Sequence, residues 1–430
     1  SSAASDVYKR QMMTLTVLLT TFTTFLVAPR HTAHAADEVS VWAWDPKFNI
    51  KALEIAQELY QKDHPDFKLN IVENAQDDIV QKLNTALSSG VTDGLPQIVL
   101  IEDYRAKSFL AAYPDSFFPL SDFFKAEDFA PYKVAATSIG DTHYAVPFDT
   151  GVTGLYVRKD LLEQSGHKVE ELQNITWDQL QKIGQDIYDK TGTKLLSVDF
   201  KDLGLVRAMI NASGSWYTTE DGKAPNLKDN EALKEAFRTL KSMNDAGLLN
   251  VHNDWSQMLQ AFNKGTVATV PQGNWITPSV TAEASQSGQW VVVPWPRQNV
   301  AGSVNASNLG GSSFYVLNVK GKEAAADFLG KTFGSSEEFY RRIMKEVGAL
   351  GTYQPLLKTD AYDQAVPYFG NQKIYKDFAE WSTKIPAVNY GEHTYAMESI
   401  VVDAFNQYLN GADLDQVLTE AQQQAENQIQ

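Results

Sequence analysis

Hydrophobic and polar positions beyond residue 38 alternate with two different periods. Apolar residues at every second position, or in short continuous runs, predict strands at 39–44, 67–71 and 97–101. Between them, apolar residues three or four positions apart predict amphipathic helices at 50–61 and 78–89. This β-α-β-α-β order implies a parallel, right-handed α/β sheet.

A second series of the same kind begins near residue 154. The segment Thr176–Gln179 matches a capping box, which opens a helix that reaches about Lys190. No long linker rich in Pro, Gly or Ser separates the two series, so we expect two lobes joined by short crossing segments. Further strands and helices are expected at 155–157, 195–198, 203–212, 231–244, 266–270, 290–293, 322–332, 335–347, 374–383, 396–409 and 414–424.

Polar and aromatic residues stand where each of the first three predicted strands ends. Ligands of α/β sheets bind beyond the carboxyl ends of the strands. We therefore expect a ligand site at this edge of the sheet. The candidate contacts there are Trp44, Asp45, Gln76, Asp103 and Tyr104.

A chain of 430 residues is longer than one hydrophobic core ordinarily accommodates, so we expect two or three domains. A net charge of −16 without a basic stripe argues against nucleic acid as a partner. The sequence contains no cysteine, which removes disulfides, thiolate metal sites and cysteine nucleophiles. The remaining chemistry has to come from other side chains.

The N-terminal segment has the pattern of a secretory signal. Lys9 and Arg10 precede the apolar run 12–27, and Ala33-His34-Ala35 gives a small-x-small cleavage pattern. An uncleaved anchor is the alternative, but the run is shorter than the roughly 20 residues that span a membrane. We expect a leader at 1–35 and an exported protein, periplasmic or at the cell surface. Residues 1–11, which have no initiator Met, are expected to be extraneous.

Motifs for metal, phosphate or nucleophilic chemistry are missing from the sequence. No H-E-x-x-H or G-x-S-x-G motif occurs. Gly330-Lys331-Thr332 is similar to the end of a Walker A loop, but Ala325 occupies the first glycine position. We therefore expect no metal and no cofactor. Adjacent carboxylates such as Glu102-Asp103 leave a glycosidase open as an alternative.

Tryptophans near turn-forming residues are the most informative chemical feature. A sugar ring has an apolar C–H face that packs on an indole, and its hydroxyls need Asp, Glu, Asn or Gln partners. We expect Trp42 to be core, and we expect sugar contacts from Trp44, Trp216, Trp275 and Trp295. Replacing Trp216 or Trp275 by alanine should then weaken binding and leave the melting temperature nearly unchanged. If these rings belonged to the core, the substitution would lower both the affinity and the melting temperature.

Four segments in order resemble the family 1 extracellular solute-binding proteins, the maltose-binding-protein-like receptors of carbohydrate ABC importers. These segments are 94–99 (GLPQIV), 144–161 (YAVPFDTGVTGLYVRKDL), 262–268 (FNKGTVA) and 309–316 (LGGSSFYV). The resemblance extends over about residues 39–420. The family's lipoprotein members carry a Cys where this sequence has Pro29, so the resemblance does not imply a lipid anchor.

The resemblance implies a two-lobed α/β periplasmic-binding-protein fold of type II, with a mainly parallel sheet in each lobe flanked by helices. Lobe 1 would comprise 36–150 plus 310–365, and lobe 2 would comprise 151–309 plus 366–430. Hinge crossovers would lie near 149–154, 308–313 and 365. By position, the ligand contacts implied are Asp149, Gly311, Ser312 and Tyr353.

The function that we expect is a monomeric receptor without catalytic activity. It would hold a mono- or oligosaccharide between its lobes and deliver it to the membrane permease of an ABC importer. The Trp42-Ala43-Trp44 opening is similar to receptors for plant-derived oligosaccharides, including arabinose-type ones. The alternatives are the same fold with a polyamine, a peptide or a chelate as ligand, or a secreted glycosidase.

Overall fold

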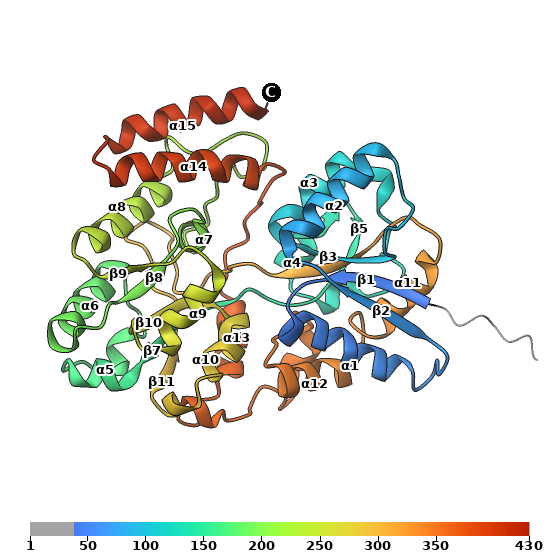
Figure 1. Ribbon diagram of the computed structural model, residues 1–430, viewed down its shortest axis with the longest axis horizontal. Coiled ribbons are helices and arrows are strands. Elements are labelled where there is room, and N and C mark those ends of the chain that lie inside the picture. The colour runs from blue at the N-terminus through green and yellow to red at the C-terminus, as the bar shows by residue number, and fades with distance from the viewer. Residues whose placement is uncertain (1–37, 430) are drawn as a thin grey trace, which may run out of the picture. The chain divides into compact units, whose positions relative to one another are not determined.

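The computed structural model describes residues 38–429. The leader expected at 1–35 and the segment 1–11 lie outside the described residues. The described chain forms two α/β lobes, each built around its own sheet (Figure 1). The predicted two-lobed α/β fold class is therefore confirmed.

Lobe 1 is built on a five-stranded sheet in the order β2-β1-β3-β12-β6. β1 is parallel to β2 and β3, whereas β12 is antiparallel to β3 and β6. The strands are β1 (Glu38–Ala43), β2 (Lys68–Glu73), β3 (Ile98–Glu102), β6 (Ala145–Pro147) and β12 (Ser312–Val316), with a small hairpin of β4 (Ser138–Ile139) and β5 (Thr142–His143). The helices are α1 (Lys51–Tyr60), α2 (Gln76–Ser89), α3 (Asp103–Ala112), α4 (Pro131–Ala136), α11 (Lys322–Lys331) and α12 (Glu337–Val347), and a π-helical turn at Pro46–Ile50 precedes α1.

The amphipathic pattern explains how these helices cover the sheet. In α1 the apolar side chains of Leu53, Ala56 and Leu59 are buried, as their spacing predicts. α2 buries only Ile79 and Leu83, and it ends at Gly90, whose φ of 69° is left-handed. Lobe 1 thus follows the sequence pattern closely.

Lobe 2 contains a three-stranded sheet, β10-β7-β11, and a parallel pair, β8 and β9. A parallel bridge between Lys194 and Val267 connects the two groups. The strands are β7 (Thr153–Arg158), β8 (Leu196–Val198), β9 (Leu249–Val251), β10 (Thr269–Gly273) and β11 (Trp290–Val293). The helices are α5 (Lys159–Gln164), α6 (Trp177–Thr191), α7 (Gly204–Asn211), α8 (Glu231–Asp245), α9 (Trp255–Asn263), α10 (Thr277–Thr281), α13 (Ile374–Ser382), α14 (Thr394–Leu409) and α15 (Leu414–Ile429). Short 3-10 helices of the chain lie at Pro114–Ser116, Ala126–Asp128, Val169–Leu172, Asn274–Ile276, Ala284–Gln286, Gln354–Lys358 and Pro367–Phe369.

The direction of the strands beside β7 differs from the expectation. Both β10 and β11 pair with β7 in antiparallel register, so a mainly parallel sheet is wrong for this part of lobe 2. Almost all of β7 is buried. An apolar run that is covered on both faces shows that a strand is central, but it carries no information about the direction of its neighbours.

Crossing segments connect the two sheets where hinges are expected. The segment 148–152 leads from β6 to β7, and 294–311 leads from β11 to β12. They pair with each other through a bridge between Val152 and Asn308 and through Leu309 N donating to Gly151 O at 2.8 Å. A Cβ at Gly151 would collide with the Leu309 carbonyl, so the close approach requires glycine. The exact lobe boundaries stay a prediction.

Candidate functional site

A cavity of about 370 Å³, which we call the front cavity, lies between the two lobes. Lobe 1 contributes Gln76 and Glu102, which stand at the ends of β2 and β3. The carboxyl ends of these strands therefore carry the site, as the rule for α/β sheets predicts. The remaining lining residues are Ser197, Val198, Asp199, Phe200, Asp202, Leu203, Gly204, Leu205, Arg207, Leu240, His252, Asp254, Trp255, Met258, Gln272, Trp275, Leu309 and Gly310.

Two stacked tryptophans form an aromatic surface in the front cavity. The Trp255 and Trp275 ring centroids are 5.8 Å apart, with 30° between the ring planes. Trp275 follows β10, and its indole N–H donates to the Leu309 carbonyl at 2.9 Å. Trp255 is 50% exposed in the first turn of α9, where Asp254 caps the helix by accepting from Gln257 N at 2.8 Å. An exposed indole that is fixed from behind offers an apolar face to a ligand.

Hydrogen-bonding groups of lobe 2 surround this aromatic surface. His252 is buried, and burial lowers the pKa of its imidazole, so the ring is neutral at pH 7. Its Nδ1 lies 2.8 Å from Ser197 Oγ, whose own proton goes to the Asn250 carbonyl. We assign Nδ1 as the protonated nitrogen on this network, which leaves Nε2 as an acceptor. Together with the carboxylates of Asp199, Asp202 and Asp254, His252 gives the lining several acceptors, which suits a ligand that donates hydrogen bonds.

Charged residues lie on the side of the front cavity next to α3 and α14. Arg207 is buried, pairs with Glu398, and donates to Asp202 at 3.0 Å. Glu102 accepts from Gln76 Nε2 at 3.1 Å and from the hydroxyl of Tyr395. Burial raises the pKa of Glu102, and the hydrogen bond from Tyr395 and the charge of a nearby arginine oppose that rise.

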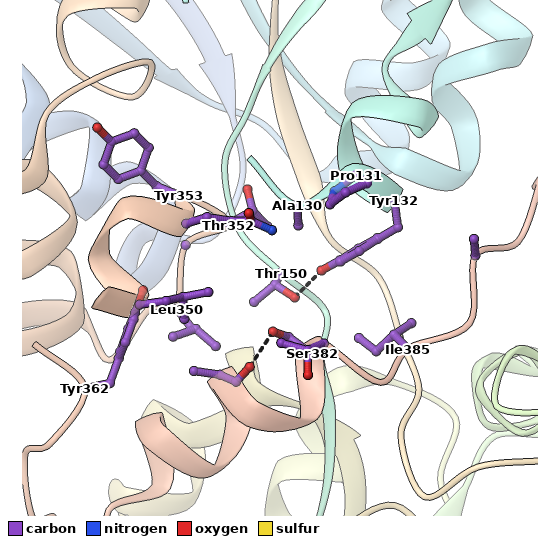
Figure 2. A pocket seen from close by; sticks show the side chains of 16 residues that line it. Ala130, Pro131, Tyr132, Thr150, Leu350, Thr352, Tyr353, Tyr362, Ser382 and Ile385 are labelled. Atoms are coloured by element: carbon purple, nitrogen blue, oxygen red, sulfur yellow. Dashed lines mark hydrogen bonds between the residues drawn. The ribbon is translucent and has the colours of Figure 1, made fainter. Parts of the chain in front are cut away.

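A second cavity, of about 310 Å³, shares no lining residue with the front cavity (Figure 2). We call it the rear cavity. Thr150 of the crossing segment 148–152 and Gly351, which forms a bridge with Asp149, are among its lining residues, and the Tyr132 and Thr150 hydroxyls are 2.5 Å apart. None of the described residues that line it is Asp, Glu, Lys, Arg or His. The rear cavity thus has less varied chemistry for recognising a polar ligand.

Among the residues predicted as contacts, Gln76 and Trp275 line the front cavity. Trp44 lies beside Gln76 and Glu102 but packs partly buried against the core of lobe 1. Asp45 is exposed and uses its carboxylate to cap the following turn, where Lys47 N donates to it at 3.0 Å.

Asp103, Asp149, Gly311 and Ser312 are buried around the crossing segment instead of lining the front cavity. Asp103 pairs with Lys133 Nζ at 2.6 Å and accepts from Ser313 Oγ at 3.0 Å. Asp149 accepts from the backbone N of Ser312 at 2.6 Å and from its hydroxyl at 2.9 Å. The polar groups of these residues thus hold the crossing segment, and a sugar contact from any of them stays a prediction.

Trp216, Trp295 and Tyr104 are core residues that do not line the front cavity, so a sugar contact from any of them stays a prediction. Trp216 is 2% exposed, and its indole N–H donates to Thr394 Oγ1 at 2.9 Å. Trp295 is fully buried and packs edge-on against Trp177 at 5.2 Å. A turn at 212–214 precedes Trp216, whereas Pro294 and Pro296 flank Trp295 in an irregular segment, and both indoles are buried. Tyr353 lies at the rear cavity, not at the front one.

Sequence reasoning missed several residues of the front cavity. Trp255 is the most prominent of them, because it is exposed and aromatic. A signal was present: Asp254 and Gln257 have the spacing of a helix cap, and this places Trp255 at the first position of a helix. Other missed polar residues include Asp199, Asp202, His252 and Gln272, which stand at or near the ends of β8, β9 and β10.

Two α/β lobes with a ligand-sized cavity between their strand ends define a solute-binding protein of the periplasmic type. Residues 56–359 match the family described as bacterial extracellular solute-binding protein, and the chain belongs to this family. Among residues 38–429, no helix has the length and hydrophobicity to cross a membrane.

Known relatives agree with this assignment. The chain is 41% identical over 400 residues to a lactose-binding protein of Rhizobium radiobacter. The aligned region covers 93% of this chain and 94% of the relative. It is 24% identical over 313 residues to an arabinooligosaccharide-binding protein of Bacillus subtilis, with 70% of each chain covered.

A solved structure shows the same fold. An ABC transporter associated binding protein from B. animalis subsp. lactis, in complex with β-1,6-galactobiose, has a TM-score of 0.77 at 22% identity. The similarity covers 92% of this chain and 98% of that one.

Proposed function

We propose that this protein is an exported sugar receptor, which binds a disaccharide in the front cavity and delivers it to the permease of an ABC importer. The observation that carries the proposal is the exposed indole of Trp255, stacked on Trp275 in a cavity that also carries carboxylate and histidine acceptors. A pyranose presents the complementary surface, an apolar face with a rim of hydroxyl donors. The protein would act as a monomer and release its ligand unchanged.

The size and the energetics of the cavity are compatible with this ligand. A volume of about 370 Å³ lies in the range of small-molecule sites. Aromatic stacking contributes roughly 0.5–1.5 kcal/mol beyond the buried area, and each net hydrogen bond contributes about as much. A micromolar dissociation constant corresponds to about 8 kcal/mol, which one stacked ring, apolar burial and several hydrogen bonds can supply.

Lactose is the disaccharide that we infer. The lactose-binding relative has higher identity and coverage than the arabinooligosaccharide-binding relatives, which supports a galactoside over the arabinose-type ligand considered from the sequence.

Calorimetry and tryptophan fluorescence with a panel of sugars test the proposal. We expect lactose to bind with micromolar affinity or better, and arabinobiose and maltose to bind more weakly. Spermidine serves as the control for a polyamine ligand. A protein that binds spermidine and none of the sugars would contradict the proposal, and so would cleavage of lactose seen by chromatography after long incubation.

A further inference from the structure

Glu102 is the one carboxylate that lobe 1 contributes to the front cavity lining among the described residues. Three neighbouring groups approach its side chain, which is 13% exposed. Gln76 Nε2 and the Tyr395 hydroxyl donate to Oε2, and Arg105 Nε lies 3.7 Å from the same oxygen. Oε1 therefore has no donor within residues 38–429, and Glu102 is one of the residues that line the cavity.

Tyr395 reaches this carboxylate from the opposite lobe. It is the second residue of α14, which packs on α15 and α8 in lobe 2. The guanidinium carbon of Arg105 lies 3.7 Å from the centroid of the Tyr395 ring, and that of Arg207 lies 5.6 Å from it. A cation over an aromatic face is attracted by the ring quadrupole. The ring is thus held between groups of both lobes, with its hydroxyl on Glu102.

We propose that Tyr395 is a positioning residue, which fixes Glu102 so that its free Oε1 accepts one hydroxyl group of the sugar. This inference rests on the proposed function. Because Gln76 and Arg105 belong to lobe 1 and Tyr395 belongs to lobe 2, the acceptor is fully oriented only while the lobes are together. Recognition of that hydroxyl is therefore coupled to closure, since a ligand favours the state in which it gains more contacts.

The specificity of the receptor follows from this arrangement. A carboxylate whose donors all converge on one oxygen presents the other in a fixed direction. A saccharide with a hydroxyl at that point gains a charge-assisted hydrogen bond, whereas the corresponding deoxy sugar does not. Glu102 and Tyr395 thus together select for one hydroxyl position of the ligand.

The test uses Tyr395→Phe, which removes the hydroxyl and keeps the ring. Tyr408→Phe is the matched control, because Tyr408 lies on the same helix and its hydroxyl has no hydrogen bond among the described residues. Calorimetry with lactose should show about tenfold weaker binding for Tyr395→Phe, since about 1.4 kcal/mol corresponds to a factor of ten. Tyr408→Phe should bind within about twofold of the parent protein.

A set of monodeoxy lactoses distinguishes positioning from a general structural role. In the parent protein, one deoxy derivative should lose about tenfold in affinity through the missing contact with Glu102. For Tyr395→Phe, the affinity of the same derivative should differ much less from that of lactose. The affinities of the other derivatives relative to lactose should be the same in both proteins. Equal ratios for every derivative in both proteins would overturn the inference.

Glu102→Gln provides a second variant in case Tyr395→Phe folds poorly. This variant should discriminate less against the same deoxy derivative. In the double variant with Tyr395→Phe, the loss of binding free energy should be smaller than the sum of the two single losses. Additive losses would count against the inference. If the parent protein binds no sugar, the proposed function fails; if it binds lactose and Tyr395→Phe behaves like Tyr408→Phe, only the role of Tyr395 fails.

Discussion

The front and rear cavities have similar volumes, about 370 and 310 Å³, but very different linings. The front cavity carries carboxylates, a histidine and an exposed indole. The lining of the rear cavity is uncharged and consists of tyrosines, aliphatic side chains, small hydroxyl residues and one amide. Volume alone therefore does not identify a sugar site. A sugar site is identified by acceptors that can pair with several ligand hydroxyls, because a sugar is bound through its hydroxyl groups as well as through its apolar face.

The wall between the two cavities is formed by the crossing segments. Leu309 and Gly310 line the front cavity, and Thr150 lines the rear one. The buried Asp103–Lys133 pair fixes this wall, because Lys133 Nζ also donates to the Ser312 carbonyl at 2.8 Å. The ion pair near the site thus has a structural role.

The largest effect should come from breaking that pair. Asp103→Ala leaves the Lys133 ammonium buried without its counter-ion, and this typically lowers the free energy of unfolding by about 3–5 kcal/mol. Urea denaturation measures the loss. A variant that is destabilised by less than about 1 kcal/mol would show that the wall between the cavities does not depend on this pair.

Trp255→Ala should weaken lactose binding by about 10- to 100-fold, the equivalent of roughly 1.5–3 kcal/mol. The melting temperature should change little, because half of the Trp255 surface is exposed. Calorimetry and thermal denaturation of the same sample check both expectations.

Trp216→Ala is the contrasting control, since Trp216 is buried and does not line the front cavity. It should cost about 3–5 kcal/mol of folding stability, as large aromatic deletions in cores do. If Trp255→Ala destabilised the fold while Trp216→Ala did not, the assignment of the two rings would be reversed.

His252 should produce a smaller, pH-dependent effect. Burial lowers the pKa of its imidazole below the ordinary value of 6.5, so at pH values just below 6.5 the unfolded chain binds a proton that the folded protein excludes. The contribution of His252 to stability therefore decreases as the pH falls from about 6.5 to the lowered pKa. Urea titrations from pH 7 to pH 5 should show a shallower decrease for His252→Gln than for the parent protein. Parallel curves would contradict this account.

Leu357→Ala at the rear cavity should have the smallest effect. Leu357 is 39% exposed, so it resembles Trp255 as an exposed apolar side chain at a cavity. We expect lactose affinity within about twofold of the parent protein, since surface substitutions outside a site change free energies by about 0.5 kcal/mol or less. A larger loss of lactose affinity, measured by calorimetry, would indicate that lactose binds in the rear cavity.

The sequence by itself determined the fold class, most helices and the edge of the sheet at which the site lies. Periodic apolar positions report burial directly, as the buried face of α1 with Leu53 and Ala56 shows. Gln76 and Trp275 could be predicted because strand ends and turns are local features of the chain.

Only the tertiary structure decided which candidate side chains line the cavity. Trp216 and Trp255 both stand near turn or capping residues, yet one is buried and the other is half exposed. Asp103 and Glu102 are neighbours in the sequence, but Asp103 turns to Lys133 while Glu102 lines the front cavity. Such choices depend on partners 20 or more residues away, such as Trp275 for Trp255 and Lys133 for Asp103, and the local pattern contains no information about them. The antiparallel neighbours of β7 were undetermined for the same reason, because burial on both faces does not encode strand direction.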